Sequence, residues 1–465
     1  MSKAGTIDLS YQQRPVNQQL EDVPGDLGWP FFGNVFELVR DPYGLVDRLY
    51  RAHGPVARTR FAGLQSVLCI GADINRRIYL DPDGDFSPMM GYAEILGQFY
   101  GGGLLMRDFD DHRVHRRLFQ TAFKNEAMRH YTDVINAVMA RSIASWERQP
   151  DFHFFPNIKT TLLDIAAQTF LGIDDLHGDE AQRVAQVFVT IAEGMLGVIH
   201  WDSPLAPFTK WRRGKEAKRY MEHYLRSQIP ARRAGDKRDI FSLVCRERDE
   251  QGHYFSDDDI AAHINFLLFA AHDTTTSNLC YIMQYLGQDP ALQQRARAES
   301  LALGKPLLEF DDLPAMEEMD KIHHEALRMN PSVMMMNRRT IREVELEGVR
   351  IPADTILAVF PQYTHRMARH WDAPEKFDPE RFSPARAEHK RHPFQYIPFG
   401  GGAHKCIGMH FAGMIVKCFM HQMLLSYEWQ VPAGYRPVHL AFPLPRQADG
   451  LSLLLRRRAS GLALV

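Results

Sequence analysis

The sequence predicts a mainly α-helical protein with small β-sheets, an α+β fold that forms one compact domain. Residues 111–228 and 257–287 show long helical patterns of apolar residues, while the strand-like stretches are all short. No internal repeat or low-complexity linker divides the chain. We therefore expect one domain, although a length of 465 residues alone would suggest about three.

The composition is that of an ordinary globular protein, with 45% hydrophobic and 24% charged residues. The 55 Lys and Arg residues nearly balance the 57 Asp and Glu residues, which argues against a nucleic-acid-binding protein. The longest apolar run is 266–271, and the polar N-terminus lacks a signal-peptide pattern. We expect no transmembrane segment and a cytoplasmic location. The five cysteines are widely spaced, so neither a disulfide framework nor a zinc site is expected.

The first half of the chain begins with a loose polar lead, predicted over residues 1–27, before a domain over 28–465. Strands are predicted at 56–61 and 66–70, joined by a turn at Gly63. The helical pattern of 111–228 follows, and a short helix is expected over 237–246. Interruptions in the long pattern are expected near Pro150, Pro156, Gly172, Gly178 and Pro204 to Pro207.

The segment 257–287 is the clearest element. Ser256 and Asp259 resemble a capping box, and apolar residues then recur at a helical period. A helix of this length spans ~45 Å, enough to cross the domain. A helix over 314–329, paired strands at 343–346 and 355–360, a helix over 409–425, and a hairpin of 439–444 with 451–455 complete the prediction.

The loop 399–408 is the most informative stretch for function. Its glycines allow the backbone to approach a flat ligand closely, and we expect Cys406 in the first turn of the following helix. The helix dipole there and the neighbouring Lys405 favour a thiolate, which can serve as an axial ligand of haem iron. The alternative is that Cys406 is a small buried hydrophobic residue.

Seven consecutive polar residues, 272–278, interrupt the apolar pattern of the long helix. Their hydroxyl groups could bond back to carbonyls one turn earlier, which would leave Asp273 unexplained. The functional alternative is a local opening of the helix, at which Asp273 and Thr274 relay protons from water into a dry pocket.

These features resemble the cytochrome P450 superfamily of haem-thiolate monooxygenases. Phe399, Gly402, His404, Cys406 and Gly408 fill the family pattern F-x-x-G-x-R/H-x-C-x-G completely. Residues 270–275 resemble the family's A/G-G-x-D/E-T-T/S pattern, except that Ala271 replaces the usual glycine. The Glu-x-x-Arg element and the later Phe377–Phe382 segment also occur in the family's order. The resemblance covers about residues 28–457.

The resemblance implies a role for each matched residue. Cys406 would be the proximal iron ligand of haem b, and Asp273 and Thr274 would deliver protons. The other implied haem contacts are Phe399, Gly408 and, at the propionates, His404, His112, Arg116 and Arg338, for which a one-residue slip to Arg339 is the alternative. Glu325, Arg328 and Arg381 would form a buried structural triad that supports the cysteine loop.

The residues expected around the substrate are mostly apolar, which favours a steroid, a terpenoid or a fatty acid. They are Met90, Tyr92, Leu96 and Phe99 in an expected loop over 86–105, Phe266, Phe269 and Ala270 in the long helix, Met334 and Met335 after the Glu-x-x-Arg helix, and Phe442 in the late hairpin. Residues 194–211 are expected to form a mobile lid, with peripheral membrane contact as the alternative.

The expected function is therefore oxygenation of a lipophilic substrate by a haem-thiolate monooxygenase. Electrons would come from a separate ferredoxin with its NAD(P)H-dependent reductase, which could dock on a basic patch of Arg113, Arg117, Lys124 and Lys405. Two alternatives remain at this point: a member of the family that uses or rearranges peroxides, and a non-catalytic haem-binding or sensing protein.

Overall fold

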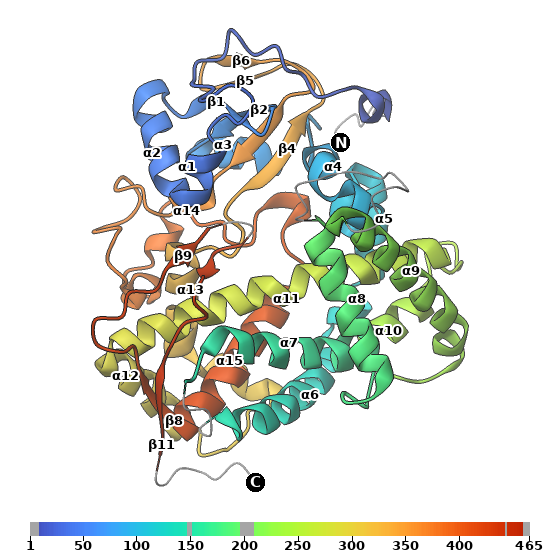
Figure 1. The fold of residues 1–465 in the computed structure, drawn as a ribbon, viewed down its shortest axis with the longest axis vertical. Coiled ribbons are helices and arrows are strands. Elements are labelled where there is room, and N and C mark those ends of the chain that lie inside the picture. Colours follow the sequence, from blue (N-terminus) through green and yellow to red (C-terminus); the bar gives the residue numbers. More distant parts are fainter. Residues whose placement is uncertain (1–8, 147–150, 196–208, 442–443, 459–465) are drawn as a thin grey trace.

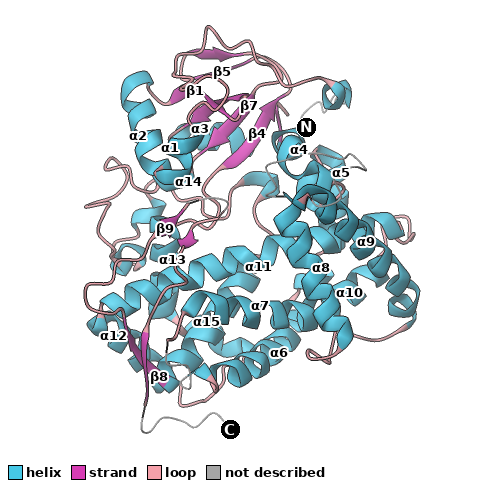
Figure 2. Cartoon of the chain, viewed as in Figure 1, coloured by secondary structure: helices cyan, strands magenta, loops and turns pink. Residues whose placement is uncertain are grey.

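The computed structural model describes residues 9–146, 151–195, 209–441 and 444–458. It is 57% helical with small sheets and forms a single compact domain, so the predicted α+β class is confirmed. Figure 1 shows the main sheet at one end of the molecule, with α1 to α3 beside it, and most of the long helices at the other end. Figure 2 shows the same division by secondary structure.

The helices follow the predicted order. Their bounds are α1 Val35–Arg40, α2 Pro42–His53, α3 Ala72–Leu80, α4 Pro88–Tyr100, α5 Phe109–Leu118, α6 Asn125–Ile143, α7 Phe154–Leu171, α8 Asp179–Met195, α9 Lys210–Ala234, α10 Ile240–Arg246, α11 Asp257–Gln288, α12 Pro290–Ala302, α13 Glu317–Met329, α14 Pro361–Thr364 and α15 Met409–Ser426.

The main sheet has five strands in the order β1-β2-β7-β4-β3, comprising β1 Val56–Phe61, β2 Leu64–Cys69, β3 Phe86–Ser87, β4 Met336–Thr340 and β7 Ile356–Val359. The predicted pairing of 343–346 with 355–360 is wrong. Strand β5 (Val344–Leu346) pairs with β6 (Val349–Ile351) instead, while β7 pairs in parallel with β2 and antiparallel with β4. The short turn at Gly348 therefore joins β5 to a nearer strand than expected.

The predicted late hairpin is also wrong. Strand β9 (His439–Leu440) pairs with β10 (Arg446–Gln447), whereas β11 (Leu454–Arg457) pairs with β8 (Tyr427–Gln430) at the end of α15. The tip residue Phe442 lies outside the described residues. Most of the segment 194–211, predicted as a lid, also lies outside them.

Helix α11 forms the centre of the helical region and packs against α7, α9, α13 and α15. The predicted cap is present, since Ser256 Oγ accepts a hydrogen bond from the Asp259 N–H at 3.0 Å. Pro156 does not break the helical pattern as expected, because it lies in the first turn of α7, where a missing N–H costs little. No helix of the described residues is long and apolar enough to cross a membrane.

Two segments near the N-terminus are more ordered than predicted. Part of the expected lead packs on the domain, with Tyr11, Leu20 and Val23 buried. The expected loop over 86–105 is mostly the helix α4, which begins with Ser87 as its cap and Pro88 in its first turn. The Ser-Pro pair is a helix-start signal that the sequence carries.

Candidate active site

The cysteine loop is held open by backbone contacts. The Cys406 N–H donates a hydrogen bond to the Phe399 carbonyl at 2.9 Å. Gly402 has a φ of +62°, and a Cβ there would lie 1.8 Å from the Tyr79 carbonyl oxygen, so only glycine fits. Cys406 lies three residues before α15 begins at Met409, rather than in its first turn as predicted.

The Cys406 thiol is accessible, in contrast to the other four cysteines, which are buried. Protein atoms nevertheless enclose the thiol closely, and this burial raises the pKa of Cys406, although the Gly408 N–H, Arg116 and Lys405 lower it. The predicted preference for a thiolate is therefore not produced by the protein charges alone. A thiol that coordinates a metal cation is deprotonated outright, so iron ligation would supply the missing stabilisation.

Two residues of α5, His112 and Arg116, contact this loop. The rings of His112 and His404 stack with centroids 3.6 Å apart. Burial and the nearby cations lower the pKa of His112 to about 4 and that of His404 to about 2, so both rings are neutral near pH 7. Each neutral ring still has one N–H to donate. Arg116 adds a guanidinium whose Nη2 bonds the Lys405 carbonyl at 2.7 Å.

Arg338 and Arg339 have different surroundings. Arg339 forms an ion pair with Asp354 at 3.0 Å and also bonds the carbonyls of Arg14 and Pro15. The Arg338 guanidinium lies 5.0 Å from the ring centroid of Tyr79. Burial is the main reason that the pKa of the nearby His404 is lowered, and the charge of Arg338 lowers it further. Of the two arginines, Arg338 is thus the one whose charge reaches the cysteine loop.

The residues of this site fit a haem. Arg116 and Arg338 are buried or half-buried cations that form no ion pair with any described residue. Buried cations without acidic partners are costly, and two carboxylates would offset that cost. The accessible thiol, the two guanidinium groups and the two imidazole donors together match a group that carries a metal and anionic arms.

The polar insert of α11 contains one strongly stabilised carboxylate. Lys159 Nζ on α7 lies 3.2 Å from Asp273 Oδ1, and His272 Nδ1 lies 3.1 Å from the same oxygen. Burial raises the pKa of Asp273, but His272 and Lys159 more than compensate and lower it to about 2. Asp273 is therefore an anion held from α7, a contact that the sequence pattern did not indicate.

Two hydroxyl groups of the insert bond back to carbonyls one turn earlier, as the structural alternative predicted. Thr274 Oγ1 donates to the Ala270 carbonyl at 2.8 Å, and Thr276 Oγ1 donates to the His272 carbonyl at 2.9 Å. Ser277 instead bonds the Pro445 carbonyl across to the segment before β10. The helix α11 continues without interruption through these residues, so the expected local opening is absent.

Replacing Lys159 with methionine should make stability depend less on pH. Because the pKa of Asp273 is about 2 in the folded protein and 3.8 ordinarily, its ionisation stabilises the fold above pH 4, and this contribution is lost as pH falls towards 2. We expect K159M to lower the unfolding free energy by roughly 1 kcal/mol at pH 7 and less at pH 3. Urea unfolding at both pH values measures this.

The matched control is Lys210→Met, which removes a lysine from a 3.5 Å exposed pair with Glu193. Exposed pairs contribute little, so K210M should change stability by less than about 0.5 kcal/mol at either pH. Equal stability losses for K159M at pH 7 and pH 3 would show that the lysine acts by packing alone.

The structure brings Glu325, Arg328 and Arg381 together. Arg328 Nε lies 2.6 Å from Glu325 Oε2, and Arg381 Nε lies 3.4 Å from Glu325 Oε1. A fourth member, Glu388, lies 3.0 Å from Arg381 Nη1. All four side chains are buried, and Glu388 was missed because its spacing carries no pattern.

The residues predicted around the substrate divide into two groups. Tyr92, Phe266, Phe269, Ala270 and Met335 keep some exposed surface, whereas Met90, Leu96, Phe99 and Met334 are buried. Phe99 packs edge-on against Trp211 of α9, with centroids 4.9 Å apart, and is part of the core. Phe269 stacks on Tyr100 at 4.3 Å, which joins α11 to the end of α4.

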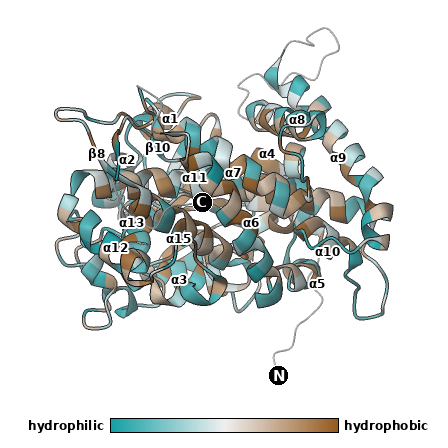
Figure 3. Cartoon of the chain, turned by 90° about the horizontal axis from the view of Figure 1, so that it is seen from below, coloured by the Kyte–Doolittle hydropathy of each residue, from teal (hydrophilic) through white to brown (hydrophobic). Residues whose placement is uncertain are grey.

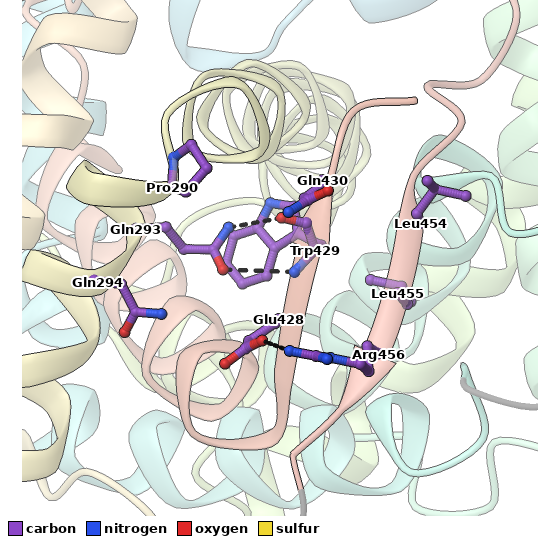
Figure 4. Close-up of a pocket in the computed structure, with 9 residues that line it drawn as sticks. All are labelled: Pro290, Gln293, Gln294, Glu428, Trp429, Gln430, Leu454, Leu455 and Arg456. Atoms are coloured by element: carbon purple, nitrogen blue, oxygen red, sulfur yellow. Dashed lines mark hydrogen bonds and ion pairs between the residues drawn. The ribbon is translucent and has the colours of Figure 1, made fainter. Parts of the chain in front are cut away.

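A surface cleft between α12, β8 and β11 is separate from this site (Figure 4). Its side chains are engaged in structural contacts: Gln293 Nε2 donates to the Trp429 carbonyl at 2.9 Å, and Glu428 pairs with Arg456. The cleft contains none of the predicted site residues.

Comparison with known proteins settles the family. The sequence model of the family described as "Cytochrome P450" matches residues 23–446. The chain belongs to the cytochrome P450 family. A protein of Mycobacterium tuberculosis that carries the name cytochrome P450 136 is 34% identical over 96% of this chain and 90% of its own. Pentalenene oxygenase of Streptomyces avermitilis is 28% identical over 89% of this chain and 92% of its own.

The fold agrees with this assignment. A solved structure described as retinoic acid-bound cyanobacterial CYP120A1 matches with a TM-score of 0.83 and 25% identity, over 94% of this chain and 99% of that one. This P450 is therefore a haem-binding monooxygenase.

Proposed function

We propose that this P450 binds haem b through Cys406 and oxygenates a terpenoid-like or steroid-like lipophilic substrate, with electrons from a separate ferredoxin-type protein. The observation that carries the proposal is the accessible Cys406 thiol in a loop that meets two neutral imidazoles and two guanidinium groups, Arg116 and Arg338, which form no ion pair within the described part of the chain. In this arrangement Arg116, Arg338, His112 and His404 would hold the haem propionates. When bound, haem iron supplies the activation of dioxygen.

The apolar side chains with free surface support the substrate class. Phe266 and Phe269 of α11 and Met335 present aromatic and thioether groups, which suit a rigid hydrocarbon ring system. Relatives are named as oxidising pentalenene, taxane and beta-amyrin, all terpenoids. A fatty acid is the runner-up, since the same surface would accept an alkyl chain.

Asp273 and Thr274 would manage protons at the pocket wall. Asp273 is anionic and partly exposed. Because Lys159 Nζ stabilises the ionised carboxylate, Asp273 would take up a proton from water and pass it on only when this contact loosens. The Thr274 hydroxyl is close in sequence and, in the structure, is turned towards the Ala270 carbonyl. Rotation about its χ1 would free this hydroxyl to donate into the pocket.

The electron donor would dock near Lys405 and Lys124. Of the basic patch expected from the sequence, Arg113 is paired with Asp110 at 2.9 Å and Arg117 with Glu250. Lys124 and Lys405 are exposed and form no ion pair with any described residue, which leaves them free for an acidic partner. Lys405 directly precedes the cysteine, so docking there would give a short electron path.

Reversal of these two charges should weaken binding of the electron donor. We expect K124E/K405E to raise the KM for an acidic ferredoxin about tenfold or more, with kcat at saturation little changed, because charge steers association. The control is R113E, whose arginine is already paired. Steady-state turnover at several salt concentrations measures this, and an unchanged KM in K124E/K405E would place the donor elsewhere.

An optical titration tests the substrate class. The purified ferric protein is titrated with matched panels of terpenoids, steroids and fatty acids while its Soret absorption is recorded. The proposal expects saturable shifts with polycyclic terpenoids or steroids at lower concentrations than with fatty acids. Shifts with fatty acids alone would overturn the proposed substrate class, and retention of no haem would overturn the site.

A further inference from the structure

A buried carboxylate, Asp108, lies where α4 and α5 begin. Asp108 is 5% exposed and forms no ion pair with any described residue. Its Oδ2 accepts hydrogen bonds from the Tyr11 hydroxyl at 2.8 Å and from the Ser87 hydroxyl. Its Oδ1 accepts one from the Met89 N–H at 3.0 Å. A buried carboxylate is costly unless donors surround it, so these three hydrogen bonds hold the group in place.

Asp108 connects the first turns of two helices. Ser87 is the N-cap residue of α4, and its hydroxyl also accepts a hydrogen bond from the Met90 N–H at 2.9 Å. Asp108 directly precedes α5, and its carbonyl accepts one from the His112 N–H at 3.0 Å. One residue therefore sets the position of α4 relative to the helix that carries His112 and Arg116.

The position of α4 matters because both of its ends contact residues of the candidate site. A Cβ on Gly91 would lie 2.7 Å from the Arg338 backbone, so α4 rests directly on β4 there. The Asn337 N–H also donates to Tyr92 Oη at 3.1 Å, and the last residue of α4 stacks on Phe269 of α11. Between these contacts α4 packs against α8 and α9 (Figure 3). A shift of α4 would therefore displace the predicted substrate residues that it carries.

The Tyr11 donor comes from the segment that precedes α1. Tyr11 is 2% exposed and packs in a cluster with Met90 and Ile341. Its ring meets that of Phe109 edge-on, with centroids 6.4 Å apart. Arg14 anchors the same segment, because its Nη2 donates to the Ile341 carbonyl at 2.6 Å. The segment therefore brings the Tyr11 hydroxyl to the start of α4 in a fixed position.

A buried tyrosine can also serve packing alone, in which case its hydroxyl would be dispensable. The environment of Asp108 argues against this. Burial raises the pKa of Asp108, and its three hydrogen-bond donors and the charge of Arg338 oppose the rise. Loss of one donor from a buried carboxylate leaves that group poorly compensated, so the first turn of α4 would be held less firmly.

We propose that Tyr11 and Asp108 form a latch that fixes α4 at the wall of the substrate site. Tyr11 is then a positioning residue, which acts through Asp108 and α4. The latch raises the affinity for large ligands, because α4 is held in one position before a ligand binds. The effect on ligands rests on the proposed function, whereas the effect on α4 does not.

The test replaces Tyr11 with phenylalanine in the haem-loaded protein, which keeps the ring and removes the hydroxyl. Two ligands that bind haem iron are titrated optically: imidazole, which is small, and clotrimazole, an imidazole that carries three phenyl rings. We expect Y11F to bind clotrimazole about tenfold more weakly and imidazole less than about twofold more weakly. Amide hydrogens of α4 should exchange with deuterium about tenfold faster, because local opening becomes easier.

Tyr220→Phe is the matched control, since Tyr220 is 39% exposed on α9. Y220F should bind both ligands as the parent does, with unchanged exchange in α4. Ser87→Ala removes a second donor from the same carboxylate. We expect the Y11F/S87A protein to lose less clotrimazole affinity than the product of the two single losses, because both residues act through Asp108.

Unchanged exchange in α4 of Y11F would overturn the latch. Faster exchange with unchanged clotrimazole binding would overturn its role at the substrate site. Equal weakening of imidazole and clotrimazole would also overturn that role, since general damage to the haem site affects both ligands. If the parent protein bound no imidazole, the proposed function would fail, and the exchange of α4 would still decide whether the latch exists.

Discussion

Cys406→Ser is expected to abolish monooxygenase turnover and the haem-thiolate absorption spectrum. Among the described cysteines, Cys406 is the one with an accessible thiol, and the loop around it is fixed by Gly402 and the Phe399 carbonyl. A serine hydroxyl cannot replace a thiolate as an iron ligand at neutral pH. The loss should exceed the about 10- to 100-fold effect of removing a second-sphere partner.

The reduced, carbon monoxide-treated spectrum measures this effect directly. Cys418→Ala is the matched control, since Cys418 is buried in α15 and should leave the spectrum unchanged. If the C406S protein kept the parent spectrum, another residue would have to be the ligand.

Glu325→Gln is expected to destabilise the fold by about 3–5 kcal/mol, the cost of breaking a buried ion pair by removing one partner. Glu325 balances Arg328 and shares Arg381 with Glu388, and none of these groups can reach water. The amide would leave two buried guanidinium groups with one carboxylate. Because Arg328 also bonds the His365 carbonyl and Arg381 the Ala373 carbonyl, the damage should spread to the support of the cysteine loop.

Glu380→Gln supplies the comparison, because Glu380 also contacts two cations, Arg295 and Lys321, but at the surface. E380Q should lower the free energy of unfolding by less than about 1 kcal/mol. Urea unfolding followed by circular dichroism gives both values. Similar costs for E325Q and E380Q would show that burial does not govern the strength of this network.

The local features of the fold and of the candidate site could be predicted from the sequence. The period of apolar residues predicted α11 closely, and the glycines around Cys406 predicted the tight loop that precedes α15. Both signals lie within a few turns of the chain. The same holds for α15, which begins where the loop ends.

Long-range contacts could not be predicted in this way. Strand β7 pairs with β2, which precedes it by almost 300 residues, and no periodicity specifies that partner. Lys159 reaches its partner Asp273 from α7, an earlier segment of the chain. The choice of Arg338 rather than Arg339 as the candidate propionate contact likewise required the neighbours of each side chain, because the two residues are adjacent in the sequence.

The pKa of Cys406 shows a different limit. From the sequence, Lys405 and a helix N-terminus favoured a thiolate, but the thiol lies before α15 and burial outweighs the nearby charges. Burial is a property of the assembled fold.

The central claim, that this P450 puts one atom of dioxygen into a lipophilic substrate, is tested most directly by isotope labelling. The protein is supplied with a ferredoxin, its reductase and NADPH, together with the terpenoid or steroid that gives the strongest optical shift, under ¹⁸O₂. The account predicts a product that carries one ¹⁸O atom, in proportion to the NADPH consumed. A product with oxygen from water only, or one formed equally well with peroxide and no electron donor, would contradict it.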